Sequence, residues 1–134
     1  MNCYFRIDPY ICFMNKAQFN KQVALKWIAA FNEHDLEKLL GLYAEVAVHY
    51  SPKLKIRKPE TNGWISGKYE LRAWWKDAFS RLPSLQYKLE NLIIEDDQIV
   101  MEYQRKVEKE PDMLIAEILE VQDGLIVKSR VYHG

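Results

Sequence analysis

Apolar residues recur at helical spacing in three stretches of the chain. In residues 17–31 they return at every fourth position, which predicts an amphipathic helix with a broad buried face. A second helix is predicted over residues 36–43, because Asp35 is a good N-cap and leucines then recur on one side. A third helix is predicted over residues 68–82, where Pro83 would end it. The chain is therefore expected to begin with about three helices.

Alternating apolar and polar residues predict strands elsewhere. Residues 45–51 follow the second helix as a strand, residues 53–62 read as a loop, and residues 63–67 form a short edge strand between glycines. Three or four long strands then cover residues 85–95, 99–109, 113–122 and 125–134. The turns between them are short and contain Asp, Gly or Pro, which favours antiparallel pairing of neighbours. We therefore expect an α+β fold with a curved sheet folded against helices.

The composition is that of one globular domain. The chain has 134 residues, of which 49% are hydrophobic, so it can bury a sizeable core without disulfides or metals. Because the sequence has no internal repeat and no linker, we expect a single domain over residues 17–134, preceded by an N-terminal arm over residues 1–16. Met14 is itself a plausible chain start, so the arm could be an upstream extension that is not native.

Charge and cysteine usage narrow the function classes. Nineteen basic and nineteen acidic residues cancel, which argues against a nucleic-acid binder, and the basic residues 53–58 are interpreted as a solvated loop. Cys3 and Cys12 have neither the number nor the spacing of a disulfide framework or a zinc site, so we expect free thiols. Arg6 and Asp8 interrupt any apolar stretch that could serve as a signal-peptide core. We expect a cytoplasmic protein without a membrane segment.

Three segments resemble the landmarks of a known superfamily. They are "WIAAFNEHDLEKLLGLYAEVAVHYSP" (residues 27–52), "GWISGKYELRAWWKDAFSRLPSL" (63–85) and "ILEVQDGLIVKSRVYHG" (118–134). They resemble the NTF2-like superfamily, in particular its SnoaL-like and ketosteroid-isomerase-like branch. The resemblance implies a cone in which a curved mixed or antiparallel sheet wraps around about three helices, with a deep apolar pocket at one end. It also implies a homodimer formed through the outer face of the sheet.

The resemblance leaves the activity open, since this superfamily includes isomerases, cyclases, hydratases, dehydratases and modules without chemistry. Its ketosteroid isomerases place a tyrosine donor in the first helix, an aspartate base before a proline at the end of the first strand, and an acid in a late strand. The matching positions hold Trp27, Ser51 and Glu117. A serine without a base beside it cannot abstract a carbon-bound proton, and an indole only donates a hydrogen bond. The sequence therefore argues against ketosteroid isomerase activity.

The orientation of the first strand is left open by two conflicting arguments. Alternation places Ala47, His49 and Ser51 on one face and Val46 and Val48 on the other. The resemblance turns the first face toward the pocket, whereas apolarity alone turns the valines inward. Inside the pocket, His49 could act as a general acid or base near neutrality. The alternative is a partly exposed histidine on the outer face of the sheet.

Glu117 is the sharper catalytic candidate. It shares a strand face with Ile115, Leu119 and Val121, which form an apolar row. A carboxylate among such neighbours is expected to have a raised pKa or a cationic partner, and either condition marks a candidate functional site. The alternative is a structural acid paired with a lysine or arginine on a neighbouring strand.

Aromatic residues make up 13% of the chain and predict an aromatic-lined pocket for a small apolar or aromatic ligand. The resemblance brings His133 to the pocket rim, although a histidine so close to the chain end is more often on the surface. No zinc, P-loop, dinucleotide or nucleophile-elbow motif is present, so we expect no metal and no cofactor. The residues predicted to bind the ligand are Trp27, Tyr43, Ser51, Trp64, Trp74, Tyr103 and His133.

Two functional hypotheses follow. In the first, the chain is a SnoaL-like protein that binds a small molecule and need not turn it over. In the second, it is an isomerase, cyclase or dehydratase that uses Glu117 and His49 for acid–base catalysis on a small apolar carbonyl compound, while Trp27 or Tyr43 orients the substrate. Ser51 in place of an aspartate favours the first hypothesis. An inward-facing Glu117 near a second titratable group, at an open cavity, would favour the second.

Overall fold

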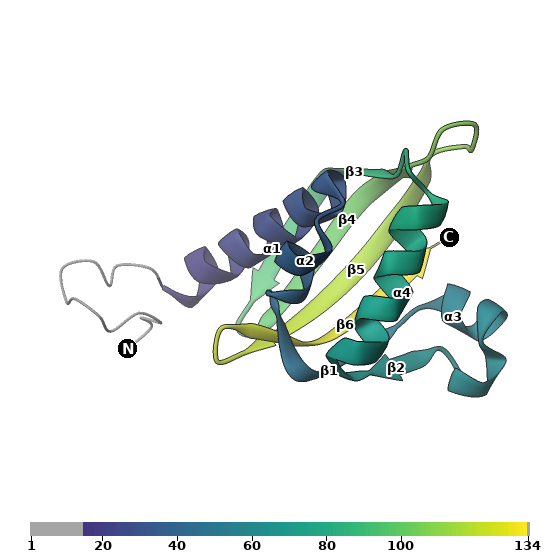
Figure 1. Cartoon of the computed structure of the whole chain (residues 1–134). Coiled ribbons are helices and arrows are strands. Elements are labelled where there is room, and N and C mark those ends of the chain that lie inside the picture. The colour runs from purple at the N-terminus through teal and green to yellow at the C-terminus, as the bar shows by residue number, and fades with distance from the viewer. Residues whose placement is uncertain (1–14, 134) are drawn as a thin grey trace.

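The computed structural model describes residues 15–133, which contain a helical first half and a second half made of long strands (Figure 1). The helices are α1 (Lys16–Glu33), α2 (Leu36–Leu40), α3 (Pro52–Arg57), the 3₁₀-helix η1 (Pro59–Thr61) and α4 (Gly67–Arg81). The strands are β1 (Tyr43–Tyr50), β2 (Trp64–Ser66), β3 (Gln86–Glu95), β4 (Gln98–Lys106), β5 (Met113–Gln122) and β6 (Leu125–His133). Cys3, Cys12 and all but the last two positions of the predicted arm lie outside the described residues.

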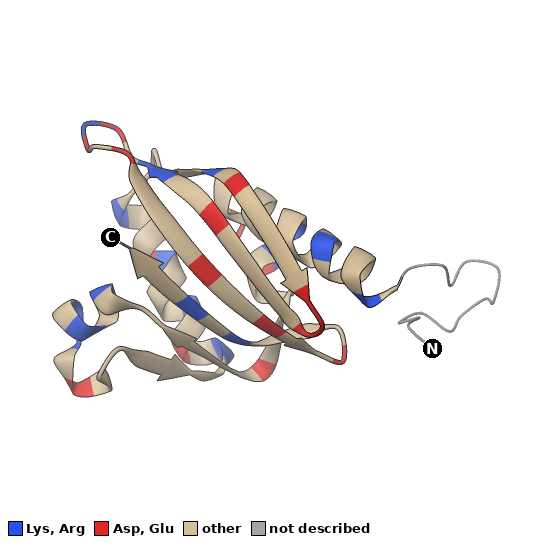
Figure 2. Cartoon of the chain, turned by 180° about the vertical axis from the view of Figure 1, so that it is seen from behind, with Lys and Arg blue, Asp and Glu red and all other residues tan. Residues whose placement is uncertain are grey.

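The strands form one six-stranded mixed sheet in the order β2-β1-β6-β5-β4-β3. All neighbours are antiparallel except β1 and β6, which are parallel. Helices α1 and α4 pack on one face with α2 between them, and no helix of residues 15–133 covers the opposite face (Figures 1 and 2). Register shifts in the β3–β4 and β5–β6 pairs mark irregularities of the kind that bend and twist a sheet. The predicted α+β class is confirmed.

Local signals determine where the helices begin and end. Asn15 and Gln18 form a capping box at the start of α1, in which each side chain accepts a hydrogen bond from the other residue's backbone N–H. Asp35 caps α2, as predicted, by accepting a backbone hydrogen bond at 3.0 Å. Helix α4 ends at Arg81, because the residue before Pro83 is sterically disfavoured in helical conformation.

Helix α2 is shorter than predicted. It ends at Leu40 rather than at residue 43, because Tyr43 opens β1 and pairs with Ile126 of β6. The backbone N–H of Ile126 also donates to the carbonyl oxygen of Leu42 at 2.8 Å. A sheet partner more than eighty positions away therefore overrides the helical spacing of the leucines.

The loop predicted over residues 53–62 is wrong, since this segment holds α3 and η1. Ser51 caps α3, and its side chain accepts a hydrogen bond from the backbone N–H of Lys53 at 3.2 Å. Pro52 occupies the first helical position, where its missing N–H is not needed. The Ser-Pro step therefore ends a strand and also begins a helix.

The structure resolves the orientation of β1. Ala47, His49 and Ser51 are buried against the helices, whereas Val46 is 81% exposed on the other side. The family resemblance gave the correct face, and apolarity alone gave the wrong one. Valines are tolerated on the outer face because β-branched side chains suit a pleated strand whether or not it is covered.

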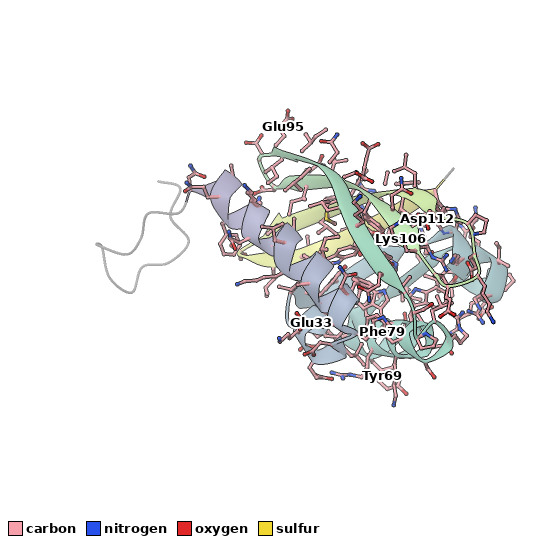
Figure 3. All side chains as sticks on the ribbon, turned by 90° about the horizontal axis from the view of Figure 1, so that it is seen from above. Glu33, Tyr69, Phe79, Glu95, Lys106 and Asp112 are labelled. Atoms are coloured by element: carbon pink, nitrogen blue, oxygen red, sulfur yellow. The ribbon has the colours of Figure 1, made fainter. Side chains whose placement is uncertain are left out.

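The core fills the space between the inner face of the sheet and α1, α2 and α4. Seen from above, these helices lie inside the curve of the sheet, and the exposed Tyr69 of α4 points away from the core (Figure 3). Aromatic rings dominate this space, with Trp27 and Phe31 at 4.4 Å between ring centroids and Tyr87 and Tyr103 at 4.2 Å. Within residues 15–133, no helix has the length and apolar composition that a membrane-spanning segment needs.

Candidate functional site

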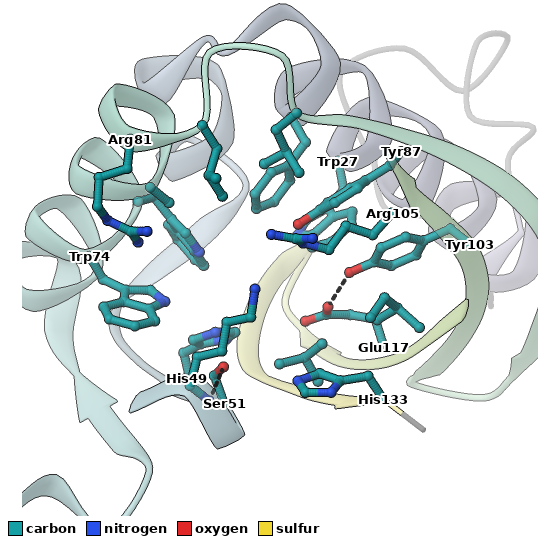
Figure 4. A pocket seen from close by; sticks show the side chains of 18 residues that line it. Trp27, His49, Ser51, Trp74, Arg81, Tyr87, Tyr103, Arg105, Glu117 and His133 are labelled. Atoms are coloured by element: carbon teal, nitrogen blue, oxygen red, sulfur yellow. Dashed lines mark hydrogen bonds between the residues drawn. The ribbon is translucent and has the colours of Figure 1, made fainter. Parts of the chain in front are cut away.

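A cavity opens between α1, α4 and the inner face of the sheet (Figure 4). Its volume is about 90 Å³. Its walls are mainly aromatic and include Trp27 and Phe31 from α1, Trp74 and Trp75 from α4, and Tyr87 from β3. Such rings offer a flat apolar surface and few hydrogen bonds, so the polar groups in the wall are the ones that would orient a ligand.

Glu117 is the acidic group of this wall. Its side chain is 2% exposed, and its Oε1 atom accepts a hydrogen bond from the Tyr103 hydroxyl at 2.9 Å. Its Oε2 atom has no hydrogen-bond partner among residues 15–133. Burial raises the pKa of Glu117 to about 8, and the hydrogen bond from Tyr103 only partly opposes that shift. Of the two conditions expected for this carboxyl, the structure has the raised pKa and not the cationic partner.

The raised pKa fixes the form of Glu117 at neutral pH. A carboxyl with a pKa of about 8 is mostly protonated at pH 7. Because the Tyr103 hydroxyl donates to Oε1, the proton is best placed on Oε2, where it has no acceptor within residues 15–133. An unsatisfied buried donor is costly, so a ligand that brings an acceptor oxygen would remove that cost.

A chain of hydrogen bonds runs from α1 to the cavity wall. The indole N–H of Trp27 donates to the Tyr43 hydroxyl at 3.1 Å, and that hydroxyl donates to Ser129 Oγ at 3.1 Å. Ser129 Oγ lies 2.7 Å from His49 Nδ1. An indole only donates, so the Tyr43 hydroxyl accepts from Trp27 and gives its own proton to Ser129. The Ser129 hydroxyl proton then finds an acceptor within residues 15–133 at His49 Nδ1. This pairing favours the His49 tautomer that accepts at Nδ1 and carries its proton on Nε2.

Burial also determines the charge of His49. It lowers the pKa of His49 to about 3, so the ring is neutral at pH 7. The predicted role of His49 as a general acid or base near neutrality conflicts with this shift. A neutral ring held in the Nε2–H tautomer is instead suited to donate a hydrogen bond.

The predicted site residues divide into those that line the cavity, Tyr43 behind its wall, and Trp64 outside it. Those that line the cavity are Trp27, His49, Ser51, Trp74, Tyr103, Glu117 and His133. Tyr43 is fully buried behind the wall and is connected to the site through Trp27, which donates to its hydroxyl, and through Ser129, which bonds His49. His133 places a buried Nε2 atom, without a partner among residues 15–133, beside the cavity.

The prediction that Trp64 lines the cavity is wrong. Trp64 pairs with Tyr50 across the β1–β2 ladder, and cross-strand partners share a face. Their rings stand 5.2 Å apart, and Lys128 Nζ lies 5.5 Å from the Trp64 ring centroid. Trp64 is 38% exposed and belongs to the outer side of the sheet.

Sequence reasoning missed the cationic residues of the cavity, which are Lys53, Arg81 and Arg105. Arg105 could have been found, because it alternates with Tyr103 on the inner face of β4. Lys53 could not, since its segment was read as a loop. Residues 15–133 contain no group of three His, Cys, Asp or Glu side chains placed to hold a metal ion.

Comparisons with known proteins identify the family. The family model of the SnoaL-like domain matches residues 24–129. The chain belongs to the SnoaL-like family. The resemblance to the NTF2-like superfamily inferred from the sequence is thereby confirmed. No curated protein sequence gives a significant match to this SnoaL-like chain.

Solved structures share the fold of this SnoaL-like protein. A SnoaL-like protein of unknown function from Burkholderia thailandensis is 26% identical, with a TM-score of 0.79, over 87% of this chain and 94% of that one. A putative ketosteroid isomerase from Kribbella flavida is 18% identical, with a TM-score of 0.72, over 87% and 78%. A putative polyketide cyclase from Sinorhizobium meliloti is 13% identical, with a TM-score of 0.70, over 83% and 94%. The latter two likenesses show the fold alone.

Proposed function

We propose that this SnoaL-like protein binds a small, largely apolar molecule that carries a carbonyl or hydroxyl oxygen. The observation that carries the proposal is the Oε2 atom of Glu117, which lies in an aromatic-walled cavity and has no hydrogen-bond partner among residues 15–133. The rings of Trp27 and Trp74 would contact the apolar body of the ligand, and the Glu117 carboxyl would donate to its oxygen.

The size of the cavity limits the ligand. A closed apolar cavity of about 150 Å³ is known to hold benzene, whereas the cavity here, of about 90 Å³, is partly open to solvent, so a single ring inside it can extend beyond its mouth. A four-ring steroid would therefore require large movements of the wall. Two positions of the ketosteroid isomerase pattern are also changed, since Trp27 and Ser51 stand where that pattern has a tyrosine and an aspartate. The Ser51 oxygen is used to cap α3. Both observations favour a compact ligand over a steroid.

A second candidate function is proton transfer to and from the bound carbonyl compound, as in an isomerase, cyclase or dehydratase. It is favoured by the environment of Glu117, whose pKa of about 8 lies close to neutrality. Such a group can donate a proton and take one back at the same pH. Tyr103 holds the carboxyl in place, and the neutral His49 ring would orient the substrate oxygen as a donor.

The test combines an NMR titration of Glu117 with ligand binding. We expect the side-chain carboxyl signal, assigned with Glu117→Gln, to titrate near pH 8 and to shift when acetophenone is added. Glu120→Gln is the matched control, because Glu120 lies on the same strand but pairs with Arg130 on the outer face. A titration near pH 4 without a ligand-induced shift would contradict the proposal.

Turnover is measured separately from binding. The methyl protons of acetophenone exchange with D₂O if Glu117 removes and returns a proton at that carbon. Exchange that is lost in Glu117→Gln and kept in Glu120→Gln would establish the second function. Binding without exchange would leave the first function alone.

A further inference from the structure

The cavity has a second polar end, which is cationic. Lys53, Arg81 and Arg105 line it, whereas Glu117 is the only lining carboxyl among residues 15–133 and is mostly protonated at pH 7. Arg81 and Arg105 point into the same space in the close view (Figure 4), and burial together with the charges of Lys53 and Arg105 lowers the pKa of His133. The lining therefore carries more positive than negative charge.

Arg105 is built into this end rather than lying on the surface. Its side chain is 8% exposed, although a guanidinium is rarely buried without full pairing. One of its N–H groups, on Nη1, donates to Glu110 Oε1 at 3.0 Å, and the guanidinium has no other hydrogen-bond partner in residues 15–133. A guanidinium has five N–H donors, so most of its hydrogen-bonding capacity is unused.

Lys53 supplies the uncompensated charge. Arg81 is paired with Asp77, and Arg105 with Glu110, but Lys53 forms no ion pair within residues 15–133. Partial burial, followed by the nearby charge of Arg105, lowers the pKa of Lys53, as expected for two cations facing one space. One surplus positive charge beside one underused guanidinium matches a ligand group with a single negative charge.

Glu117 and Arg105 have well-separated backbone positions on the inner face of the sheet. Glu117 is paired with Met101 in the β4–β5 ladder, and Arg105 lies four residues further along β4 on the same face. At about 3.4 Å per residue, roughly 14 Å of strand separates the two backbone positions. A ligand can therefore meet Glu117 with one oxygen and Arg105 with another group.

We propose that the ligand is an organic monocarboxylate, whose carboxylate is bound by the Arg105 guanidinium and the Lys53 ammonium while its carbonyl or hydroxyl oxygen meets Glu117. This inference rests on the proposed function, because it names the ligand class of the same cavity. A planar carboxylate fits a guanidinium edge with two parallel hydrogen bonds, which a neutral ligand cannot form.

The experiment compares acids with their neutral amides of the same shape. The probes are 4-oxopentanoate and 4-oxo-4-phenylbutanoate, each beside its amide, with affinities from NMR titration at low salt. We expect each acid to bind at least tenfold more tightly than its amide. Arg105→Gln should abolish that preference while leaving amide binding within twofold, and Lys53→Met should reduce it several-fold.

Two matched variants test whether the preference for the acids depends on this site or on any positive charge of the protein. Arg130→Gln removes an arginine that is also paired with one glutamate, but on the outer face of the sheet. Lys55→Met removes an exposed lysine from the same helix as Lys53. Both should keep the preference for the acids.

The outcomes distinguish this inference from the function on which it rests. If acetophenone and the amides bind as tightly as the acids, the inference is overturned and the proposed function stands. If no carbonyl compound shifts the Glu117 signal, both are overturned. Tighter binding of phenyl phosphate than of either acid would overturn the carboxylate class.

Discussion

Ser129 Oγ lies 2.7 Å from His49 Nδ1, and the two residues are direct neighbours in the only parallel strand pair among residues 15–133. Both are buried, and Ser129 also accepts from Tyr43. The serine hydroxyl thus connects the first and last strands of the fold to the wall of the cavity. By donating to Nδ1, the same hydroxyl favours the His49 tautomer that carries its proton on Nε2.

Replacing Ser129 by alanine tests this connection. Ser129→Ala leaves Tyr43 without an acceptor and His49 Nδ1 without a donor, so we expect the free energy of unfolding to fall by about 1–3 kcal/mol. Urea denaturation measures this loss. Ser66→Ala, at an exposed position without a side-chain cap bond, should change it by less than about 0.5 kcal/mol.

The tautomer of His49 gives a second measurement on the same variant. In the wild type, ¹⁵N spectra should show a neutral ring protonated at Nε2, down to about pH 5. In Ser129→Ala the preference for that tautomer should weaken, because nothing then donates to Nδ1. A wild-type His49 that becomes charged between pH 6 and 7 would contradict the burial argument.

Glu117 should make stability depend on pH. Its pKa is about 8 in the folded protein, against an ordinary value of 4.5 for a glutamate in water, so the folded state binds the proton more tightly. The contribution is fully present below about pH 4.5 and is lost as pH rises toward 8, at up to roughly 1.4 kcal/mol per pH unit. Urea unfolding between pH 6.5 and 8 is the cleanest window, because His49 loses its proton in the unfolded state near 6.5.

A variant isolates this contribution. Glu117→Gln keeps the size and a hydrogen-bond acceptor but cannot ionise, so its stability should no longer fall over that range. Glu120→Gln, on the opposite face of the same strand, should retain the slope of the wild type. Equal slopes in the wild type and Glu117→Gln would mean that Glu117 is not desolvated.

The sequence predicted the parts of this site that depend on neighbours along one strand. Glu117 stood out because a carboxyl shared a face with Ile115 and Leu119, and both are buried. His49 required the family resemblance, since the valines beside it argued for the opposite orientation. The α+β class and most element positions followed from periodicity alone.

The remaining parts depend on contacts between distant segments. Tyr43 was assigned to a helix because its pairing with Ile126 is not visible in local spacing. The cationic end was missed because Lys53 belongs to a helix that begins at the Ser-Pro step and reaches the cavity beside Arg105 of β4. Trp64 was misplaced because two residues of a three-residue edge strand face outward.

The homodimer implied by the resemblance is a further prediction. The outer face of the sheet is not covered by any helix of residues 15–133 (Figure 2). It exposes Ile93, Leu114 and Tyr132. We expect sedimentation equilibrium to give twice the chain mass, and Leu114→Glu with Tyr132→Glu to give the monomer. Tyr69→Glu, at a more exposed tyrosine on α4, should leave the dimer intact. A monomeric wild type would refute the prediction.

Tyr103 should tune the acidity of Glu117. Its hydroxyl donates to Oε1 at 2.9 Å, and that hydrogen bond lowers the pKa of Glu117 against the larger effect of burial. Tyr103→Phe removes the donor and keeps the ring, so the pKa of Glu117 should rise further above 8. Carboxyl NMR measures that shift directly.

The same substitution tests whether Glu117 transfers protons. If Glu117 acts as a base toward the bound carbonyl compound, the pH at which exchange reaches half its maximum should rise with the pKa in Tyr103→Phe. Tyr132→Phe, on the outer face, should change neither value. An unchanged pKa in Tyr103→Phe would mean that burial alone sets the acidity of Glu117, and that the phenol serves packing rather than the carboxyl.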